Sequence, residues 1–341
     1  MSRLQRLMAL LEGNAFRDIL CMPLVFGSAA FLTDVKLKQY LQNGEILAQC
    51  QLNAQQVFDY DAVFVYGDNC IEAEALGTNV FFPENAYPYI TNYLLENSSQ
   101  LSDLPVVDPY RDGRMPELLR AAAYLRTELG DHLPVVGVVL GPMSIASQLM
   151  GLERLLYLFL DSPTGFERVI KYSAEISRKL GLALLAQGVH ISAVIDPSAS
   201  GSIIPEEVFV RYIQPCLRDI FTHFKEAGAL ACWLMITGNT QELLPHYSQC
   251  GIEIASIDYE VSLTEALKWG EELIIAGNMK PYSFVNKTPQ DIFDLSNKLI
   301  GQVAGRQRFV LSSGCEIPLD SKPENLLAFV RGSKCGDKYG A

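Results

Sequence analysis

The feature that most constrains the fold is an alternation of short apolar runs with segments of helical spacing. The runs are rich in β-branched, aliphatic or aromatic residues and most end at Gly, Asp or Asn, as the buried strands of a parallel sheet do. Eight such units in one α/β chain predict a (β/α)₈ TIM barrel. A doubly wound sheet is the alternative, but no G-x-G-x-x-G motif follows the first run. The predicted strands cover residues 21–26, 62–66, 135–140, 191–195, 230–236, 252–257, 273–276 and 308–311.

The segments between the strands predict helices and one long excursion. Residues 79–109 contain four prolines and have no clear period, so we expect a lid-like excursion over the barrel mouth. No charge run, low-complexity stretch or linker marks a second domain, so a single barrel domain with an N-terminal helix is expected over residues 1–341. The predicted helices lie within 1–13, 34–51, 115–129, 147–187 (two helices), 205–227, 263–269 and 289–303.

Composition argues against two kinds of partner. The 27 basic and 39 acidic residues give a net charge of −12, whereas nucleic acid is bound by basic surfaces, so no nucleic acid partner is expected. Residues 133–152 carry no charge, but prolines and glycines divide them into a strand, a turn and a helix start. We therefore interpret this stretch as core and expect no membrane span.

The cysteines and the first residues indicate the compartment. Eight cysteines form no C-x-x-C pair and lack the spacing of a disulfide scaffold, so they are interpreted as reduced thiols. Residues 1–13 contain two arginines within a helical Leu/Met pattern and lack the apolar core of a secretory signal. These observations predict a cytoplasmic protein.

The loop after the last strand carries the most promising site residue. It reads Ser-Ser-Gly-Cys-Glu-Ile-Pro at 312–318, where Gly314 is expected to free the backbone to turn. Helix signals resume at Pro323, so Cys315 is placed on a strand-to-helix loop, where α/β folds bind ligands. The alternative is that Cys315 is a buried, inert thiol.

Other residues follow the predicted strands and would converge at the same mouth. Asp68 and Asp196 are carboxylates directly after strands, where a buried acid could exchange protons or hold a ligand. Asp196 precedes a proline and could instead cap the turn and helix that follow it. The candidates for substrate binding are Gln148, Ser200, Met235, Thr237, Asn239, Asp258, Tyr259 and Asn278.

Two of these candidates bear on metal binding. Met235 and Thr237 lie two residues apart on a strand, so their side chains face the same way and could flank Cys315 across the barrel. A thioether and a hydroxyl are poor zinc ligands, since zinc prefers thiolate, imidazole and carboxylate. The four histidines fall on the side away from the predicted mouth and are not expected to be ligands.

The loop motifs are specific as a set. They are Gly67-Asp68 with E-A-E-A-L-G at 72–77, G-P-M-S at 141–144 with L-M-G at 149–151, D-P-x-A-S-G at 196–201, G-N-T at 238–240, Gly277-Asn278 with Pro281, and G-C-x-I-P at 314–318 with Glu324-Asn325. Over almost the whole chain they resemble the uroporphyrinogen decarboxylase superfamily. Within it they look like the methylcobamide:coenzyme M methyltransferase branch, whose members move a methyl group between a corrinoid protein and a thiol. The fold that this resemblance implies is again the (β/α)₈ barrel.

The resemblance is incomplete at the zinc site. In the zinc methyltransferases the loop after the fifth strand reads H-x-C-G and, with the cysteine of the last loop, supplies three metal ligands. Here these positions hold Met235, Thr237 and Gly238, so Cys315 alone remains as a metal ligand of the family kind. The device that would produce a thiolate at neutral pH is missing, so a zinc site of that kind is not expected.

True decarboxylases resemble this chain less. Their first strand is followed by a motif with two arginines that hold the acetate and propionate groups of the tetrapyrrole, whereas residues 26–31 contain no basic side chain. Their late histidine aligns with Cys315 and their mid-chain tyrosine falls near Gln148. Asp68 matches their catalytic aspartate, but decarboxylation of a porphyrinogen is not expected.

Three hypotheses follow from the resemblance. The first is a corrinoid-dependent methyltransferase component of one-carbon metabolism, working with a separate corrinoid (cobalamin-type) protein that docks over the barrel mouth. Asp68 and Asp196 would orient the substrate or shuttle a proton, and Cys315 would be a ligand or contact residue. The small-molecule methyl donor or acceptor would be something other than a zinc-activated thiol, such as an O-methyl or N-methyl donor. The second is a catalytically inactive binding or regulatory relative, and the third is the decarboxylase itself.

Overall fold

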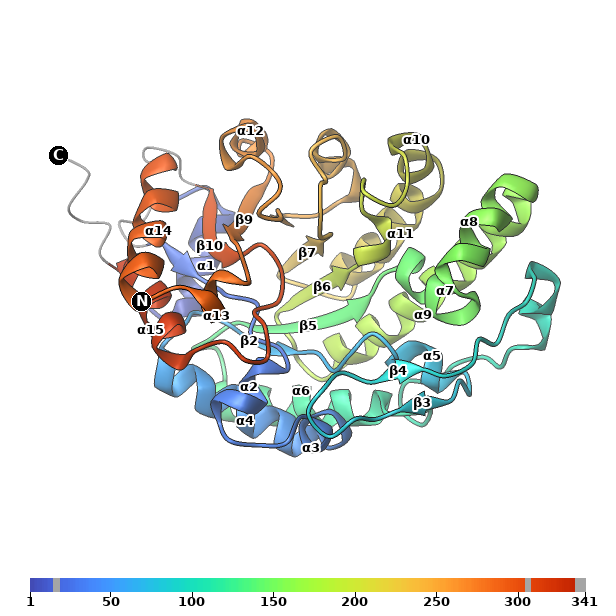
Figure 1. The fold of residues 1–341 in the computed structure, drawn as a ribbon, viewed down its shortest axis with the longest axis horizontal. Helices are drawn as coiled ribbons and strands as arrows, with labels where there is room; N and C mark the ends of the chain where they lie inside the picture. The colour runs from blue at the N-terminus through green and yellow to red at the C-terminus, as the bar shows by residue number, and fades with distance from the viewer. Residues whose placement is uncertain (15–18, 304–307, 335–341) are drawn as a thin grey trace.

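The computed structural model describes residues 1–14, 19–303 and 308–334, and its main sheet has eight parallel strands. Their order is β1-β10-β9-β8-β7-β6-β5-β2, so strands that follow one another in this sheet lie side by side, and helices surround the curled sheet (Figure 1). The predicted barrel is confirmed, and each predicted strand overlaps an observed one. The strands are β1 (Leu20–Cys21), β2 (Val63–Val65), β5 (Val135–Leu140), β6 (Ile191–Ile195), β7 (Ala231–Met235), β8 (Ile254–Ser256), β9 (Ile274–Met279) and β10 (Phe309–Ser313).

The ring is closed between β1 and β2 largely by side chains. The Asp61 N–H donates to the carbonyl of Cys21 at 2.7 Å, and the Cys21 N–H donates to Asp61 Oδ2 at 2.7 Å. Further along the same two segments, the buried side-chain amide of Gln51 lies between them. It donates to the Val25 carbonyl at 2.9 Å and accepts from the Phe64 N–H at 3.2 Å. Gln51 therefore supplies hydrogen bonds that a regular strand pair would have made between backbones.

The last two strands run further than predicted, to Met279 and Ser313, which pair with each other in register. Polar residues can continue β10 because their hydroxyls bond to the segment after β1. The Ser312 hydroxyl donates to the Met22 carbonyl at 2.7 Å, and the Ser313 hydroxyl accepts from the Leu24 N–H at 3.1 Å.

Each predicted helical segment contains observed helix, but two segments differ in detail, and the short helices Ser28–Leu32, Ile71–Ala75 and Ser283–Asn286 were not predicted. The predicted helix at 34–51 is two helices, because the amide oxygen of Asn43 accepts the Glu45 and Ile46 N–H groups at 3.0 and 3.1 Å and so begins a new helix. The predicted helix at 205–227 contains a π-helical turn at Phe209–Ile213, just before Pro215, which has no N–H to continue the regular ladder. The helices are α1 (Arg3–Leu11), α2 (Ser28–Leu32), α3 (Leu37–Gln42), α4 (Gly44–Phe58), α5 (Ile71–Ala75), α6 (Met115–Leu129), α7 (Pro142–Met150), α8 (Leu152–Asp161), α9 (Pro163–Ala186), α10 (Glu206–Val208), α11 (Gln214–Glu226), α12 (Leu263–Ala266), α13 (Ser283–Asn286), α14 (Pro289–Gln302) and α15 (Pro323–Lys334).

The uncharged stretch at 133–152 forms β5 and α7, both largely buried, as its interpretation as core predicts. Among the helices of the described residues, none combines the length and apolarity needed to cross a membrane.

Aromatic rings fill the barrel interior. Phe26 packs against Phe64 and Tyr66 with ring centroids 5.3 and 4.8 Å apart, and Phe64 lies 6.1 Å from Trp233. The Trp233 indole N–H donates to the Ser256 hydroxyl at 2.9 Å, so its one polar group is satisfied. Phe64 of β2 and Tyr66, directly after the strand, both pack on Phe26, as alternation of side chains along an extended chain predicts.

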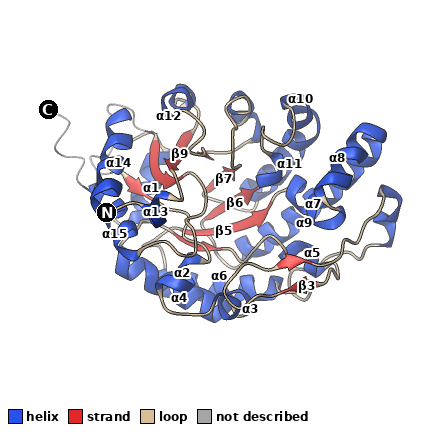
Figure 2. Cartoon of the chain, viewed as in Figure 1, coloured by secondary structure: helices blue, strands red, loops and turns tan. Residues whose placement is uncertain are grey.

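The excursion at 79–109 is mainly loop, as Figure 2 shows, with a short antiparallel pair of β3 (Val80–Phe81) and β4 (Tyr89–Ile90). A 3₁₀ helix at Ser98–Asp103 follows. The excursion carries Tyr87 and Pro88 to the barrel mouth, where both line a cavity. Its closing over a bound ligand stays a prediction.

Candidate functional site

A cavity of about 230 Å³ lies at the carboxyl ends of the strands. Three predicted site residues line it together: Asp68 after β2, Thr237 after β7 and Cys315 after β10. Parallel strands whose loops share one mouth bring these positions together although the chain separates them widely. The full lining is Tyr66, Asp68, Asn69, Tyr87, Pro88, Ile195, Pro197, Thr237, Cys315 and Glu316.

Asp68 is held by a buried arginine that the sequence did not reveal. The two carboxylate oxygens of Asp68 accept from Arg114 Nη1 and Nη2 at 2.6 and 3.2 Å, and Oδ1 also accepts from the Cys70 N–H at 2.8 Å. Arg114 Nε donates to Glu74 at 2.6 Å. The bidentate pair orients the Asp68 carboxylate at the cavity wall.

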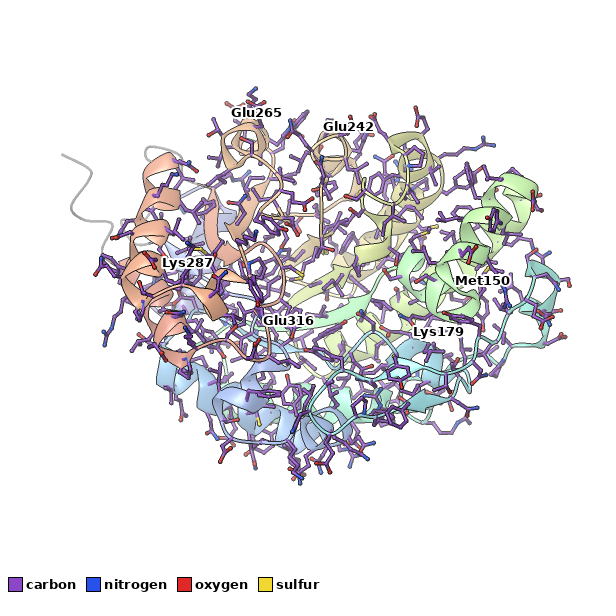
Figure 3. The ribbon with its side chains drawn as sticks, viewed as in Figure 1. Met150, Lys179, Glu242, Glu265, Lys287 and Glu316 are labelled. Atoms are coloured by element: carbon purple, nitrogen blue, oxygen red, sulfur yellow. The ribbon has the colours of Figure 1, made fainter. Side chains whose placement is uncertain are left out.

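Glu316 is the second carboxyl group of the cavity. The Tyr87 hydroxyl donates to Glu316 Oε1, and the Gly27 N–H donates to the same oxygen at 3.1 Å. Burial raises the pKa of Glu316 to about 7, against the lowering effect of these two hydrogen bonds. Figure 3 labels Glu316 on the loop after β10, towards the middle of the molecule. A carboxyl group in this setting changes protonation state near neutral pH.

Cys315 lies half-buried beside Glu316. Burial, with the charges of Glu316 and Asp258, raises the pKa of the Cys315 thiol to about 12. The thiol is therefore protonated at neutral pH and is a weak nucleophile. The chain bends at Gly314, directly after β10. A Cβ at this position would lie 2.6 Å from the Tyr259 nitrogen, so the glycine also permits a close approach to the loop after β8.

Asp196 lies just behind the cavity wall and faces a helix end. Its Oδ1 accepts from the Ser144 N–H at 2.8 Å and the Ser144 hydroxyl at 2.6 Å, and its Oδ2 accepts from the Met143 N–H at 3.1 Å. These donors belong to the first turn of α7, so Asp196 caps the helix after the neighbouring strand. The alternative that it caps the turn directly after itself is wrong. Burial raises the pKa of Asp196 to about 6.

Two of the remaining candidates, Asp258 and Asn278, bind backbone groups of neighbouring loops at the mouth. Asp258 Oδ2 accepts from the Gly238 N–H at 2.9 Å, which ties the loop after β8 to the loop after β7. The Asn278 amide donates to the carbonyls of Asp258 and Val261 at 3.1 and 2.9 Å. Their roles as substrate contacts stay predictions, and the cavity lining does not include Gln148, Ser200, Met235, Asn239, Asp258, Tyr259 or Asn278.

Comparison with known proteins identifies the family. The model of the uroporphyrinogen decarboxylase (URO-D) family matches residues 2–334. The chain belongs to this family.

Among curated members, the chain is 29% identical over 299 residues to the methylcobamide:CoM methyltransferase MtbA of Methanosarcina mazei, covering 86% of this chain and 85% of the relative. It is 20% identical over 295 residues to the uroporphyrinogen decarboxylase of Thermodesulfovibrio yellowstonii, covering 84% and 82%. A solved methyltransferase structure from M. mazei superimposes with a TM-score of 0.89 at 20% identity over 98% of both chains. The predicted family and its likeness to the methylcobamide methyltransferases are confirmed.

The residues present do not fit the zinc ion that the methyltransferase branch implies. The positions at which the resemblance expects two of its ligands hold Met235, which is buried, and Thr237, whose hydroxyl is a poor ligand. Across the described ranges, no group of three or more His, Cys, Asp or Glu side chains is placed to hold a metal ion. No chemical step is therefore assigned to zinc.

Restoring the two lost ligands tests this interpretation. We expect the double variant Met235→His with Thr237→Cys to bind one zinc ion per chain and the parent chain to bind none, because the variant completes a set of three ligands with Cys315. Metal analysis of protein purified without chelator measures both. A triple variant that also carries Cys315→Ala should lose the ion. Stoichiometric zinc in the parent chain would show that other side chains hold it.

Several residues of the site were not predicted from the sequence. Tyr66 continues the inward positions of β2 and could have been found from strand alternation, and Glu316 adjoins Cys315. Tyr87 lies in a segment without periodicity, and Arg114 precedes α6, far from the mouth in sequence. Nothing local marks either residue as part of the site.

Glu72 of α5, which does not line the cavity, gives a test of buried charge. Its Oε1 accepts from the Leu140 N–H at 2.8 Å, and its Oε2 has no hydrogen-bond partner within the described residues. Burial raises the pKa of Glu72 to about 7, above the usual value of about 4.3 in an unfolded chain. The folded protein therefore binds this proton more tightly, and its stability falls as the pH rises from about 4.3 to about 7.

We expect Glu72→Gln to abolish this loss, because the amide keeps the acceptor and cannot ionise. At about pH 8 the variant should be more stable than the parent by about 3 kcal/mol, and near pH 4.5 the two should be equal. Urea unfolding of both proteins at both pH values measures the difference in their free energies of unfolding. The other titrating groups are the same in the two proteins, so they do not contribute to this difference. An equal difference at both pH values would contradict the assignment.

Proposed function

We propose that this chain is the methyltransferase component of a corrinoid-dependent system. It moves a methyl group between a small molecule bound in the cavity and a corrinoid carried by a separate protein. The partner docks over the carboxyl ends of the strands, where the cavity opens beside the exposed Asn69. We place the protein in the cytoplasm and in one-carbon metabolism, in keeping with the seven free cysteines of the described residues.

The observation that carries the proposal is the cavity itself, in a chain whose curated relatives include methylcobamide:CoM methyltransferases at 28 and 29% identity. Its volume suits a small molecule, and its lining combines aromatic rings with a few polar groups, as ligand sites do. Transfer of a methyl group requires mainly that donor and acceptor be held in line and kept from water. A rigid barrel mouth with an open side provides such an arrangement.

The residues of the cavity divide between holding the substrate and handling protons. The Thr237 hydroxyl and the Asn69 amide can donate hydrogen bonds to a bound substrate, and Tyr66 packs on Phe26 beneath it. The Asp68 carboxylate, oriented by Arg114, can accept one. Cys315, being protonated, acts as a contact residue rather than as a nucleophile. Asp196 stabilises the loop through α7, so its effect on substrate would be indirect.

The assay is incubation with corrinoids and candidate methyl compounds. The chain is mixed with methylated corrinoid carrier protein or with free cob(I)alamin, and the corrinoid absorbance is followed as candidate acceptors or donors are added. We expect a change of absorbance that depends on the chain and on one class of small molecule. No change with any corrinoid and any methyl compound would overturn the proposal.

A binding or regulatory relative without catalysis is the second candidate, and one observation favours it. The buried Met235 and the protonated Cys315 leave the family's metal-binding machinery without its thiolate. In that case a Cys315→Ala variant and the parent chain would both bind the small molecule, and neither would change the corrinoid. Uroporphyrinogen serves as a third substrate in the same series, and its decarboxylation would support the family's other activity.

A further inference from the structure

The polar groups of the cavity wall are mainly oxygens, on two carboxyl groups, two phenols and one hydroxyl. They belong to Asp68, Glu316, Tyr66, Tyr87 and Thr237. Among the described residues that line the cavity there is no lysine, arginine or histidine. An anionic ligand would therefore find no cation to pair with, whereas the partial negative charges of the oxygens favour a ligand with a positive charge.

The arginine behind the wall does not change this polarity. Arg114 does not line the cavity, and it donates from Nη1 and Nη2 to Asp68 and from Nε to Glu74. Its Nη1 also donates to the Leu41 carbonyl at 3.1 Å, and the centre of the Phe82 ring lies 4.6 Å from its Cζ. Two carboxylates share this one guanidinium, so it is not left to bind an anion in the cavity.

Many oxygens of the wall already take part in hydrogen bonds. Both oxygens of Asp68 accept from Arg114. The Tyr87 hydroxyl donates to Glu316, and the Tyr66 hydroxyl donates to a neighbouring side-chain amide. A cation without N–H groups suits such a wall, because it needs no further hydrogen-bond acceptor. The quaternary ammonium group is a cation of this kind.

Apolar surfaces complete the wall. They come from the rings of Tyr66 and Tyr87 and from Pro88, Ile195 and Pro197. A quaternary ammonium group presents methyl groups to apolar surfaces, and its charge is attracted by aromatic rings, most strongly where water is displaced. The volume of about 230 Å³ gives room for one small molecule of this class.

We propose that the small molecule of this cavity is a quaternary ammonium cation that carries the transferred methyl group on its nitrogen; this inference rests on the proposed function. The bond between the methyl carbon and the nitrogen breaks, and its electron pair stays on the nitrogen, which leaves as a neutral tertiary amine. The methyl carbon bonds to the Co(I) of the partner's corrinoid, which supplies both electrons of the new bond and becomes Co(III). The leaving amine needs no proton from the wall.

Calorimetric titration with choline and with 3,3-dimethylbutan-1-ol tests the ligand class without turnover. The two molecules have nearly the same shape, but the alcohol has a neutral carbon in place of the charged nitrogen. We expect choline to bind at least about 10-fold more tightly than the alcohol. Similar dissociation constants, or no binding of choline, would overturn the inference.

Variants of two tyrosines test whether the cation binds in this cavity. Tyr87→Leu removes a ring from the wall and should weaken choline binding about 10-fold. Tyr87→Phe keeps the ring and should keep most of the binding. Tyr89→Leu is the matched control, because Tyr89 is exposed and does not line the cavity, so choline binding should not change. Equal losses in Tyr87→Leu and Tyr89→Leu would place the cation elsewhere.

A variant of Asp68 tests the role of charge. Asp68→Asn leaves Arg114 with one carboxylate fewer, so the wall becomes less favourable to a cation. Choline binding should weaken, and binding of the neutral alcohol should stay the same. An equal effect on both ligands would mean that Asp68 contributes shape and not charge, which contradicts the proposal.

Methyl transfer to cob(I)alamin separates this inference from the proposed function. We expect the corrinoid absorbance to change with tetramethylammonium or choline and not with methoxybenzene, a neutral methyl compound. Transfer from methoxybenzene and from neither cation would overturn the inference and keep the methyltransferase function. Tight binding of choline without transfer from any donor would support the ligand class and overturn the proposed function.

Discussion

Replacing Arg114 by Met is expected to destabilise the fold by about 3–5 kcal/mol, because it leaves two carboxylates of the site without their cation. Arg114 binds Asp68 through two nitrogens and Glu74 through the third, donates to the Leu41 carbonyl at 3.1 Å, and lies 4.6 Å from the centre of the Phe82 ring. Its side chain is almost fully buried, so water cannot replace these contacts. The free energy of unfolding in urea at neutral pH measures the loss.

Two controls make the Arg114 result specific. Arg120→Met removes a cation six residues further on, in α6, whose side chain is 60% exposed, and an ion pair with so exposed a partner contributes under about 1 kcal/mol. Adding Asp68→Asn to Arg114→Met removes one of the two carboxylates that lost their partner, so the double variant should recover part of the stability. If the double variant is no more stable than the single one, the pairing of Asp68 with Arg114 is not what the arginine contributes.

Replacing Gln51 by Leu is expected to cost about 2–6 kcal/mol, the second of the two largest effects. Leucine has a similar volume but leaves the Phe64 N–H and the Val25 carbonyl buried without partners, at about 1–3 kcal/mol each. The Tyr40 hydroxyl, which accepts from the Gln51 amide at 3.0 Å, loses its bond as well. These groups lie on the two segments where β1 meets β2. We therefore expect this part of the ring to lose its hydrogen bonds before the rest does.

Urea unfolding and amide hydrogen exchange together check the Gln51 prediction. The Phe64 amide should exchange faster in Gln51→Leu, even under conditions where the protein stays folded. Gln55→Leu is the matched control, because Gln55 lies one helical turn further along α4 and its amide makes one bond, to the Tyr60 carbonyl at 3.0 Å. Its cost should be about half as large, with no change at Phe64. Equal effects of both variants would mean that Gln51 does not close the ring.

The strands were predictable because each is a local signal. An apolar run of β-branched residues bounded by turn residues needs no partner to be recognised, and eight of them in alternation with helices leave few topologies. The positions that the apolar pattern did not predict are held by polar residues. Ser312 and Ser313 continue β10 only because Met22 and Leu24 lie opposite them, and Asn43 divides a helix at a position that periodicity alone does not mark.

The candidate site divides in the same way. The sequence predicted that Asp68, Thr237 and Cys315 lie at one mouth, because each follows a strand. The structure brings all three to one cavity. The partners that set their chemistry come from elsewhere: Arg114 from the start of α6, and Tyr87 from a segment without period. Asp196 has the sequence context of a local cap, yet its partners lie 52 and 53 residues away on α7.

The order of the chain alone determined the ring of strands, the end of the ring at which loop residues gather, and the kinship with the URO-D family. Only the tertiary structure decided which carboxyl group is paired with an arginine and which has a raised pKa. Asp68 and Glu316 are both acids on strand-end loops, but one meets a guanidinium and the other a phenol and an N–H. The physical reason is that protonation depends on burial and on charges a few ångströms away, which come from segments far apart in sequence.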